Sequence, residues 1–494
     1  MRLEGRVENT GSRAMGAGVL ILAILGSCTS RSGIADERDY GGLADPICEA
    51  AASVLPLSLP DAIVQALQNE PHVIVAKAEA AESKADAKAA IAPFLPKAQL
   101  VIDEERLLPN SAFQPVTVVG ANVLGGARAY SAYGAISISW NLLSSGHDIA
   151  GLRASREDAE ASVEALHGQF ADTLSNVLKA YAGLYETTIA LDQQGHSLLL
   201  LKAIARRADE RYQHGNGTTI AIGQARGAAL DAEKSFNESC RSLTEKSSDL
   251  AKAIGLRLPP GKIFEATGAM PEAPPYASEI ADIQQAIESD PAVAASKRKE
   301  LAAAQRFRQT HSAFGPQISL DARRDYLGQN IDSFSAANNA LAPNSYRVDV
   351  SLMQPIFPLV AELAAMDKAK AEVRRAAALT EEARNEADSK LRTALSASEE
   401  AAASYRAARA NRQEAQKVLA LTDSLYKAGR TSLDELDHAN IDLQKAEADV
   451  ETLGSERMRA GWDVERALEA ANFPTQLMKR LGIELTDQYL REGM

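Results

Sequence analysis

An internal duplication constrains the fold of this chain more than any other feature of its sequence. The stretch "LSLPDAIVQALQNEPHVIVAKAEA", which begins at Leu57, matches "ASEIADIQQAIESDPAVAASKRKE", which begins at Ala277. Farther along, "RYQHGNGTTIAIGQA" from Arg211 matches "LYKAGRTSLDELDHA" from Leu425. The offset is constant within each pair, which indicates two copies of one structural unit. A fold proposed for the first copy must therefore also suit the second.

Long stretches without proline predict that each unit is mainly helical. No proline occurs between Pro115 and Pro259, or between Pro358 and Pro474. Aromatic residues make up only 5% of the chain, so packing would rest on alanine-rich seams of the coiled-coil type. In the first copy we expect a leading helix over 58–92, a long helix over 148–213 and a further helix over 218–255. At 1.5 Å per residue they would be roughly 50, 100 and 55 Å long, so the two short helices laid end to end would match the long one.

The duplication also predicts how the chain is divided. The expected segments are a signal peptide with a lipobox-like end (1–28), a mature amino-terminal segment (29–56), the first repeat (57–255), a Pro/Gly-rich linker (256–276), the second repeat (277–470) and a carboxy-terminal segment (471–494). Each repeat would run helix, strand, strand, long helix, short turn and helix. The fold class is thus mainly α with a small β part.

Two strands are expected between the leading helix and the long helix of each copy, because apolar and polar residues alternate there. The clearest examples are "QISLDAR" from Gln317 and "SYRVDVSL" from Ser345. The apolar residues, predicted to face lipid, are Ile136, Ile138, Trp140, Ile318, Leu320, Val348, Val350 and Leu352. The polar residues, predicted to face a pore, are Asp321, Arg323, Arg347 and Asp349.

Strands of about ten residues with one apolar and one polar face are typical of outer-membrane barrels. After residue 28 the chain has no apolar run of about 18 residues or more, so strands would have to make any membrane crossing. Four strands per chain cannot close a barrel, because the smallest barrels have eight. Three chains would supply twelve. The alternative is an ordinary four-stranded sheet that caps a soluble helical protein.

The amino terminus is typical of a secretory signal. Three arginines precede an apolar run over residues 14–25, which is too short to span a bilayer permanently. The run ends in "LGSC", which resembles a bacterial lipobox and would make Cys28 the acylated first residue of the mature protein. Thr29 stands where an inner-membrane retention signal would need aspartate, so this resemblance implies the outer membrane. The alternative is an ordinary signal cleaved nearby, with Cys28 incidental.

Charge and motif content exclude several classes of function. The formal net charge of −13 disfavours nucleic acid as a partner, because phosphates demand a basic surface. The chain has no HExxH, CxxC, GxSxG or P-loop pattern, and its 7 histidines include no ligand-like pair. We therefore expect no enzyme, no metal site and no cofactor. A disulfide between Cys48 and Cys240 would suit an oxidising compartment, but their spacing does not decide it.

The order of these parts resembles the TolC-type outer-membrane efflux and secretion channels. The matching phrases are "LSLPDAIVQALQNEPHV", "AIAPFLPKAQL", "ISISWNLLSSG", "RYQHGNGTT" and "LYKAGRTSLDELDHA", and the resemblance covers nearly all of residues 57–470. It implies a homotrimer with a twelve-stranded barrel in the outer membrane and a long α-helical barrel across the periplasm. It also implies two partners for tripartite efflux or type I secretion. These are a periplasmic adaptor (membrane fusion protein) and an inner-membrane pump of the resistance-nodulation-division or ABC type.

The turn between the last two helices of each copy is where this resemblance implies functional contacts. Glycines at these turns suit a tight reversal with positive φ. The residues implied to contact the adaptor are Tyr212, Gly215, Gly217, Gly429 and Thr431. Past the second turn, threefold symmetry would repeat inward carboxylates as a ring that filters cations or closes the pore. The residues assigned to this periplasmic gate are Tyr426, Arg430, Asp434, Glu435 and Asp437. The alternative is a solvated helix start, where the helix dipole favours acidic residues anyway.

A second class of function also fits the long helices and the lipid anchor, namely a lipid-anchored periplasmic coiled-coil adaptor or scaffold. Such a protein normally carries one helical hairpin flanked by β-rich domains. A duplicated unit with paired alternating strands favours the channel instead.

Overall fold

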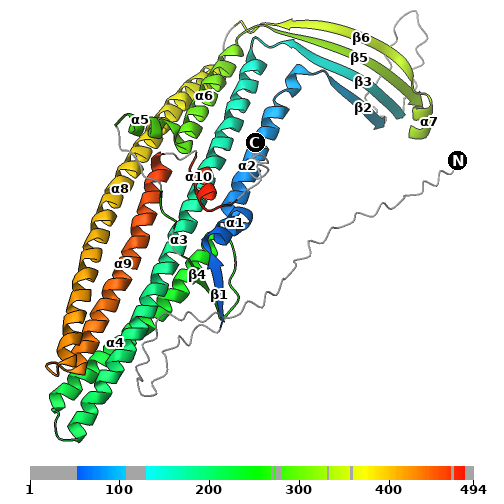
Figure 1. Ribbon diagram of the computed structural model, residues 1–494. Coiled ribbons are helices and arrows are strands. Elements are labelled where there is room, and N and C mark those ends of the chain that lie inside the picture. Colours follow the sequence, from blue (N-terminus) through cyan, green and yellow to red (C-terminus); the bar gives the residue numbers. More distant parts are fainter. Residues whose placement is uncertain are drawn as a thin grey trace, which may run out of the picture. The chain divides into compact units, whose positions relative to one another are not determined.

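The computed structural model describes residues 53–106, 130–268, 271–273, 280–330, 333–356, 360–468 and 472–483. All of them lie in one unit of the fold, residues 45–494. The helices are α1 (Leu59–Asn69), α2 (Pro71–Ala89), η1 (Ala92–Phe94), α3 (His147–Gln213), α4 (Thr219–Ala253), α5 (Ile280–Ser289), α6 (Pro291–Ser312), α7 (Phe334–Asn339), α8 (Val360–Lys427), α9 (Leu433–Leu468) and α10 (Phe473–Arg480) (Figure 1). Within the described ranges, none of the helices is both long and apolar enough to cross a membrane.

The duplication in the sequence is a duplication of helices. The long helices α3 and α8 have 67 and 68 residues, and the helices that follow them, α4 and α9, have 35 and 36. Each long helix packs on its follower as a hairpin, and α3 also packs on α9 and α6. Figure 1 shows α8 and α9 running side by side, and α3 beside α4. The long helix predicted over 148–213 is confirmed by α3.

A proline divides the leading helix of each copy in two. Pro71 and Pro291 are the first residues of α2 and α6, and the residue before each of them caps the helix. The Glu70 carboxylate accepts the Val73 amide at 3.0 Å, and the Asp290 carboxylate accepts the Ala292 amide at 2.8 Å. Because proline lacks an N–H and pushes the preceding residue to an extended conformation, one continuous helix cannot form there. The prediction of a single helix over 58–92 was wrong at this point.

Four strands form one antiparallel sheet. They are β2 (Lys97–Arg106), β3 (Tyr130–Leu143), β5 (Gln317–Asn330) and β6 (Ala342–Met353), in the order β2-β3-β5-β6. The central pair, β3 and β5, therefore joins the first copy to the second, as the strands in Figure 1 show. The segment between β5 and β6 contains the short helix α7, which the sequence did not predict.

The register of this sheet separates apolar from polar residues. Leu320 lies opposite Trp140 on one side and Val350 on the other. Residues directly opposite each other share a face, so the residues predicted as apolar in β3, β5 and β6 all lie on one face. On the other face Asp321 lies opposite Asp349. The predicted separation into two faces is confirmed by the register, although the apolar face also carries charged residues: Arg324 lies between Ile136 and Tyr346, and Glu104 lies opposite Ala132.

A second, two-stranded sheet was not predicted. β1 (Ser53–Ser58) pairs in parallel with β4 (Lys262–Thr267), which lies inside the predicted linker. Ser247 on α4 is fully buried and its hydroxyl accepts the Phe264 amide at 2.6 Å. The Tyr181 hydroxyl on α3 donates to the Thr267 carbonyl at 2.8 Å, and burial raises the pKa of Tyr181 to about 12. This sheet packs on α3 and α4 and is part of the main apolar core.

Candidate functional site

Both helical hairpins end in the same hydrogen-bonded turn. At the first turn, the Gly215 amide donates to the Tyr212 carbonyl and the Asn216 amide to the Arg211 carbonyl, each at 2.9 Å. The same two bonds at the second turn join Gly429 to Tyr426 and Arg430 to Leu425, also at 2.9 Å. The φ angles of Gly215 and Gly429 are +77° and +68°, as a Schellman turn requires. The prediction of positive φ at these two glycines is confirmed.

Gly217 is needed for a different reason from the one predicted. Its φ is not positive, so the expectation of a left-handed backbone there was wrong. A Cβ at this position would lie 2.7 Å from the Tyr212 nitrogen and 2.9 Å from its Cα, closer than real Cβ atoms come. The equivalent position in the second copy is Thr431, so the backbone of the two turns must differ there.

A cluster of charged residues joins the two hairpins next to the turns. The Nε of Arg207 on α3 donates to Asp434 on α9 at 2.9 Å. A second nitrogen of Arg207 donates to Asp437, and Arg211 donates to Asp434. Asp437 is only 4% exposed. Burial by itself would lower the pKa of Arg207, but its hydrogen bonds to Asp434 and Asp437 outweigh burial, so the pKa of Arg207 is raised and its guanidinium stays charged. We call these four residues the hairpin clamp.

The predicted gate residues are thus only partly grouped. Asp434 and Asp437 share one face of α9, as their spacing predicts, but this face packs on α3 of the same chain. Glu435 points elsewhere: its carboxylate lies 3.4 Å from the Ser432 amide, while the Ser432 hydroxyl accepts the Glu435 amide at 3.2 Å. This is a capping box, and the "SLDE" sequence was a signal for it.

The remaining members of the predicted gate are at the surface. Tyr426 is 39% exposed and Arg430 is exposed. Among the residues predicted to contact an adaptor, Tyr212, Gly215 and Gly429 are exposed, while Gly217 and Thr431 are half-buried. Arg207 and Arg211 were missed, because no pattern within one helix tells which residues of another copy it will meet.

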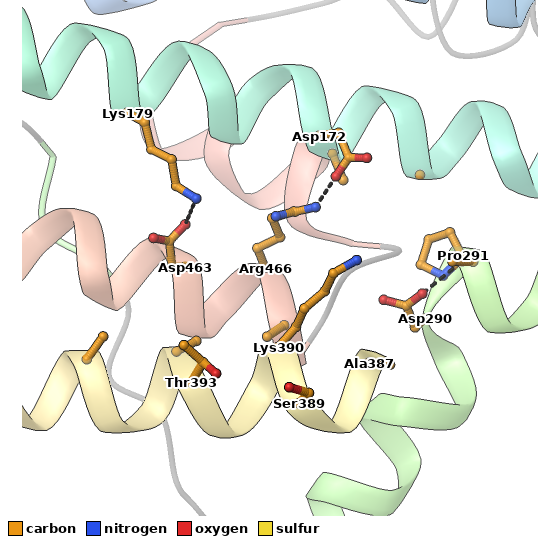
Figure 2. A pocket seen from close by; sticks show the side chains of 16 residues that line it. Asp172, Lys179, Asp290, Pro291, Ala387, Ser389, Lys390, Thr393, Asp463 and Arg466 are labelled. Atoms are coloured by element: carbon orange, nitrogen blue, oxygen red, sulfur yellow. Dashed lines mark hydrogen bonds and ion pairs between the residues drawn. The ribbon is translucent and has the colours of Figure 1, made fainter. Parts of the chain in front are cut away.

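A cavity of about 350 Å³ lies between α3 and α8, some distance along these helices from the turns. The last turns of α9 and the first turn of α6 also line it. Figure 2 shows side chains of α3 and α9 reaching each other across it. The Lys179 nitrogen lies 3.4 Å from an Asp463 oxygen, and Arg466 pairs with Asp172. These two ion pairs cross the cavity and stabilise the packing of α3 on α9.

The polar face of the four-stranded sheet carries a network around Asp325. Its carboxylate accepts the Tyr133 hydroxyl at 2.6 Å, the Arg323 Nε at 2.6 Å and the Ser345 hydroxyl at 3.0 Å. Of the residues predicted to face a pore, Arg323 belongs to this network, and Arg347 lies 3.8 Å from Asp349. Tyr133 and Asp325 were not singled out from the sequence, although both continue the alternation of β3 and β5.

The opposite, apolar face of the four-stranded sheet is exposed to solvent in the single chain. The exposed fractions of Val348, Val350 and Leu352 are 64%, 68% and 69%. Trp140 is 39% exposed, and its ring nitrogen donates to the Phe94 carbonyl at 3.1 Å. The Arg324 guanidinium lies 5.4 Å from the centre of the Tyr326 ring. A contiguous apolar sheet face of this kind normally meets lipid or another protein surface.

Two predictions fall outside the described residues, namely the signal peptide and its lipobox Cys28. Cys48 lies outside them as well, whereas Cys240 on α4 is disulfide-bonded. Among the described residues, no group of three or more His, Cys, Asp or Glu side chains is placed to hold a metal ion.

Comparisons with solved structures show where this arrangement recurs. CusC matches with a TM-score of 0.68 and 18% identity, over 83% of this chain and 91% of that chain. The CmeC outer membrane channel of Campylobacter jejuni matches with a TM-score of 0.67 and 17% identity, over 85% and 89%. The outer membrane protein VceC of Vibrio cholerae matches with a TM-score of 0.64 and 17% identity, over 83% and 95%. At these identities the likeness shows a shared fold.

A search of curated proteins gives no match. The model of the outer membrane efflux protein family, in contrast, matches residues 62–256 and 283–468. These two stretches cover most of the chain, and each contains one copy of the duplicated unit with its hairpin turn. This chain belongs to the outer membrane efflux protein family.

Proposed function

We propose that this protein is the outer-membrane duct of an export system and works as a homotrimer. The observation that carries the proposal is the four-stranded sheet with one apolar and one polar face, in a chain of the efflux family. Three such sheets would close a twelve-stranded barrel with its apolar face toward lipid and its polar face toward water. The long helices would continue the duct through the periplasm.

The edges of the sheet support closure between chains. Within the described residues, β2 and β6 each pair on one side only. Unpaired strand edges attract another strand, and a barrel removes them altogether. In the trimer, β6 of one chain would pair with β2 of the next. Arg324, Tyr326 and Tyr346 would then mark a boundary of the lipid band, where aromatic and long basic side chains are favoured.

The turns would lie at the periplasmic end of the duct. There the exposed residues at both turns would meet a periplasmic adaptor, which would couple the duct to an inner-membrane pump of the resistance-nodulation-division or ABC type. The hairpin clamp would hold α9 against α3 in the closed state, with Tyr426, Arg430 and Glu435 nearby at the surface. Acylation of Cys28 would add a lipid anchor in the outer membrane. Membership in the efflux family favours this duct over a coiled-coil adaptor.

The proposal is tested by purifying the protein in detergent, measuring its mass by light scattering and recording conductance in planar bilayers. We expect a trimer that conducts ions. Arg207→Ala should raise the open probability, because it removes the central member of the clamp, whereas Arg226→Ala, which removes a surface pair with Asp209, should not. A monomer that is soluble without detergent would overturn the duct and favour the adaptor.

A further inference from the structure

A groove lined by arginines lies between the two helices of the second hairpin, α8 and α9, which run side by side (Figure 1). Its volume is about 560 Å³. The charged residues that line it are Glu399, Arg406 and Arg409 of α8 and Arg457 of α9. These three arginines and one glutamate give the groove a formal charge of +2, whereas the whole chain carries −13. We call it the arginine groove.

The first copy shows what the same place in a hairpin looks like without a groove of this kind. Gln213 and Lys427 end the long helices α3 and α8, while Thr219 and Leu433 begin the followers α4 and α9. Both helix boundaries match at an offset of 214 positions. The two hairpins can therefore be compared residue by residue.

Leucines occupy the equivalent positions of the first hairpin. At this offset Ser398, Tyr405, Arg412 and Arg457 correspond to Leu184, Leu191, Leu198 and Leu243. Leu184, Leu198 and Leu243 are 0%, 2% and 7% exposed and belong to apolar clusters that contain residues of both α3 and α4. Apolar side chains are thus enough to join the helices of such a hairpin. Packing alone does not account for the arginines of the second one.

The arginines of α8 are not neutralised by their own helix. Arg406, Arg409 and Arg412 follow one another at intervals of three, and like charges at this spacing repel each other. No acidic residue lies three or four positions from any of them. Glu399 lies seven residues before Arg406, which is roughly 10 Å along the helix. Among the residues that the structure describes, no carboxylate pairs with Arg406 or Arg409.

Arg457 completes the groove from α9. Its guanidinium lies 5.0 Å from the centre of the Tyr405 ring, and one of its nitrogens lies 3.5 Å from Glu272, whose side chain is 76% exposed. The Nε of Arg457 is buried and has no hydrogen-bond partner among the described residues, and the same is true of Arg412. A buried donor without an acceptor is unfavourable. The groove and its surroundings therefore present more cationic donors than the described chain can satisfy.

We propose that the arginine groove binds an oxyanion of the phosphate class, either free phosphate or the phosphate group of a larger molecule. A guanidinium matches phosphate with two parallel N–H donors. A phosphate group offers at least three acceptor oxygens, enough for three guanidinium groups, whereas a carboxylate offers two. Arg406 and Arg409 are exposed, so a ligand can reach them from solvent.

The bound oxyanion would connect the two helices of the second hairpin. Arg406 and Arg409 of α8 and Arg457 of α9 would share one anion, which would also remove the repulsion along α8. Charge would then join α8 to α9 where leucines join α3 to α4. All of these residues belong to one chain, so the site goes beyond the proposed duct and does not depend on a trimer or on conduction.

The proposal is tested with the full-length protein in detergent and with inorganic phosphate as the probe, at constant ionic strength kept with chloride. Broadening of the phosphorus NMR signal measures binding. We expect Arg406→Gln/Arg409→Gln to lower the affinity for phosphate at least about tenfold, because two charge-assisted contacts are lost. Both residues are exposed, so the variant should keep its helical circular dichroism. Arg392→Gln, at an exposed residue of α8 that lies 2.8 Å from Asp388, is the matched control and should bind phosphate as the parent does.

A phosphate monoester distinguishes the two sources of the ligand. If glycerol 3-phosphate displaces inorganic phosphate from the parent at similar concentrations, the groove accepts the phosphate group of a larger molecule. If it does not, the groove accepts the free ion.

Hydrogen exchange tests whether the ligand joins the helices. At a phosphate concentration about ten times the Kd, we expect exchange in peptides from 398–412 and around Arg457 to slow by up to about tenfold in the parent and to stay unchanged in the double variant. Equal phosphate binding by the parent and the double variant would overturn the site. So would a parent that leaves the phosphate signal unbroadened at about 10 mM. Either result would leave the proposed duct untouched, since conductance and light scattering test that separately.

Discussion

Arg207 and Asp437 come from different copies of the duplicated unit, yet they form an ion pair in which the aspartate is 4% exposed. Burying a carboxylate is unfavourable unless a cation and hydrogen bonds compensate for the lost water. Arg207 provides both and also binds Asp434, at 2.9 Å. The last turns of α3 in the first hairpin and the first turns of α9 in the second are therefore held together by ion pairs that centre on Arg207.

Removing Arg207 should loosen the start of α9. Arg207→Ala leaves Asp437 buried without its cation, which should cost about 2–3 kcal/mol, less than for a fully buried pair because Arg211 still holds Asp434. We expect hydrogen exchange in the first turns of α9 to rise by roughly 50-fold. Mass spectrometry of exchanged peptides measures this. Arg226→Ala, at an exposed pair within the first hairpin, is the control, and an unchanged rate in Arg207→Ala would contradict the clamp.

The first turn should not tolerate a side chain at Gly217. In Gly217→Ala the new Cβ would lie 2.7 Å from the Tyr212 backbone nitrogen, so the turn must shift. We expect a local destabilisation of about 1–3 kcal/mol and faster proteolysis between α3 and α4. Thr431→Ala, at the equivalent position of the second turn, is the matched control and should leave cleavage there unchanged. Resistance of Gly217→Ala to the protease would show that the turn relaxes without cost.

The helices were predictable because their signals are local. Freedom from proline and a high alanine content extend over whole helices, so the prediction of 148–213 agrees with α3 (His147–Gln213). The alternation of apolar and polar residues along the strands likewise predicted two different faces of the sheet, and the pairing of the strands confirms them. The break at Pro71 was also readable, since proline begins helices more readily than it continues them.

What the sequence did not reveal depends on residues that are far apart along the chain. β1 and β4 are six residues long each and pair across about 200 positions, with no alternation to mark them. Similarly, the spacing of Asp434 and Asp437 places them on one helix face, but nothing in that spacing shows that the face meets Arg207. Contacts between helices require their packing, which is tertiary information.

Glu186 on α3 should make stability depend on pH. Burial raises the pKa of this carboxyl, and the nearby Arg459 opposes burial only in part. The native state therefore binds the proton more tightly than the unfolded state, so stability falls as the pH rises from the unfolded pKa through the native pKa. The glutamine in Glu186→Gln cannot ionise. We therefore expect the melting temperature of this variant minus that of the parent to be higher at pH 7.5 than at pH 4.5, by roughly 1–3 °C.

Thermal unfolding followed by circular dichroism at the two pH values measures this difference. Glu238→Gln, at a side chain that is 67% exposed, is the control and should show no such change with pH. If Glu186→Gln changed the melting temperature by the same amount at both pH values, Glu186 would not be the titrating group.

The two faces of the four-stranded sheet can be tested with neighbouring residues of β6. Val350 lies on the apolar face and is 68% exposed in the single chain, whereas Asp349 lies on the polar face opposite Asp321. If the apolar face meets lipid, Val350→Arg should cost about 2–4 kcal/mol per chain, and the trimer in outer-membrane fractions should fall at least about tenfold. Asp349→Asn keeps a polar group toward water and should leave the yield unchanged. Immunoblots of unheated samples measure both, and equal losses in the two variants would show that these faces are not lipid and pore.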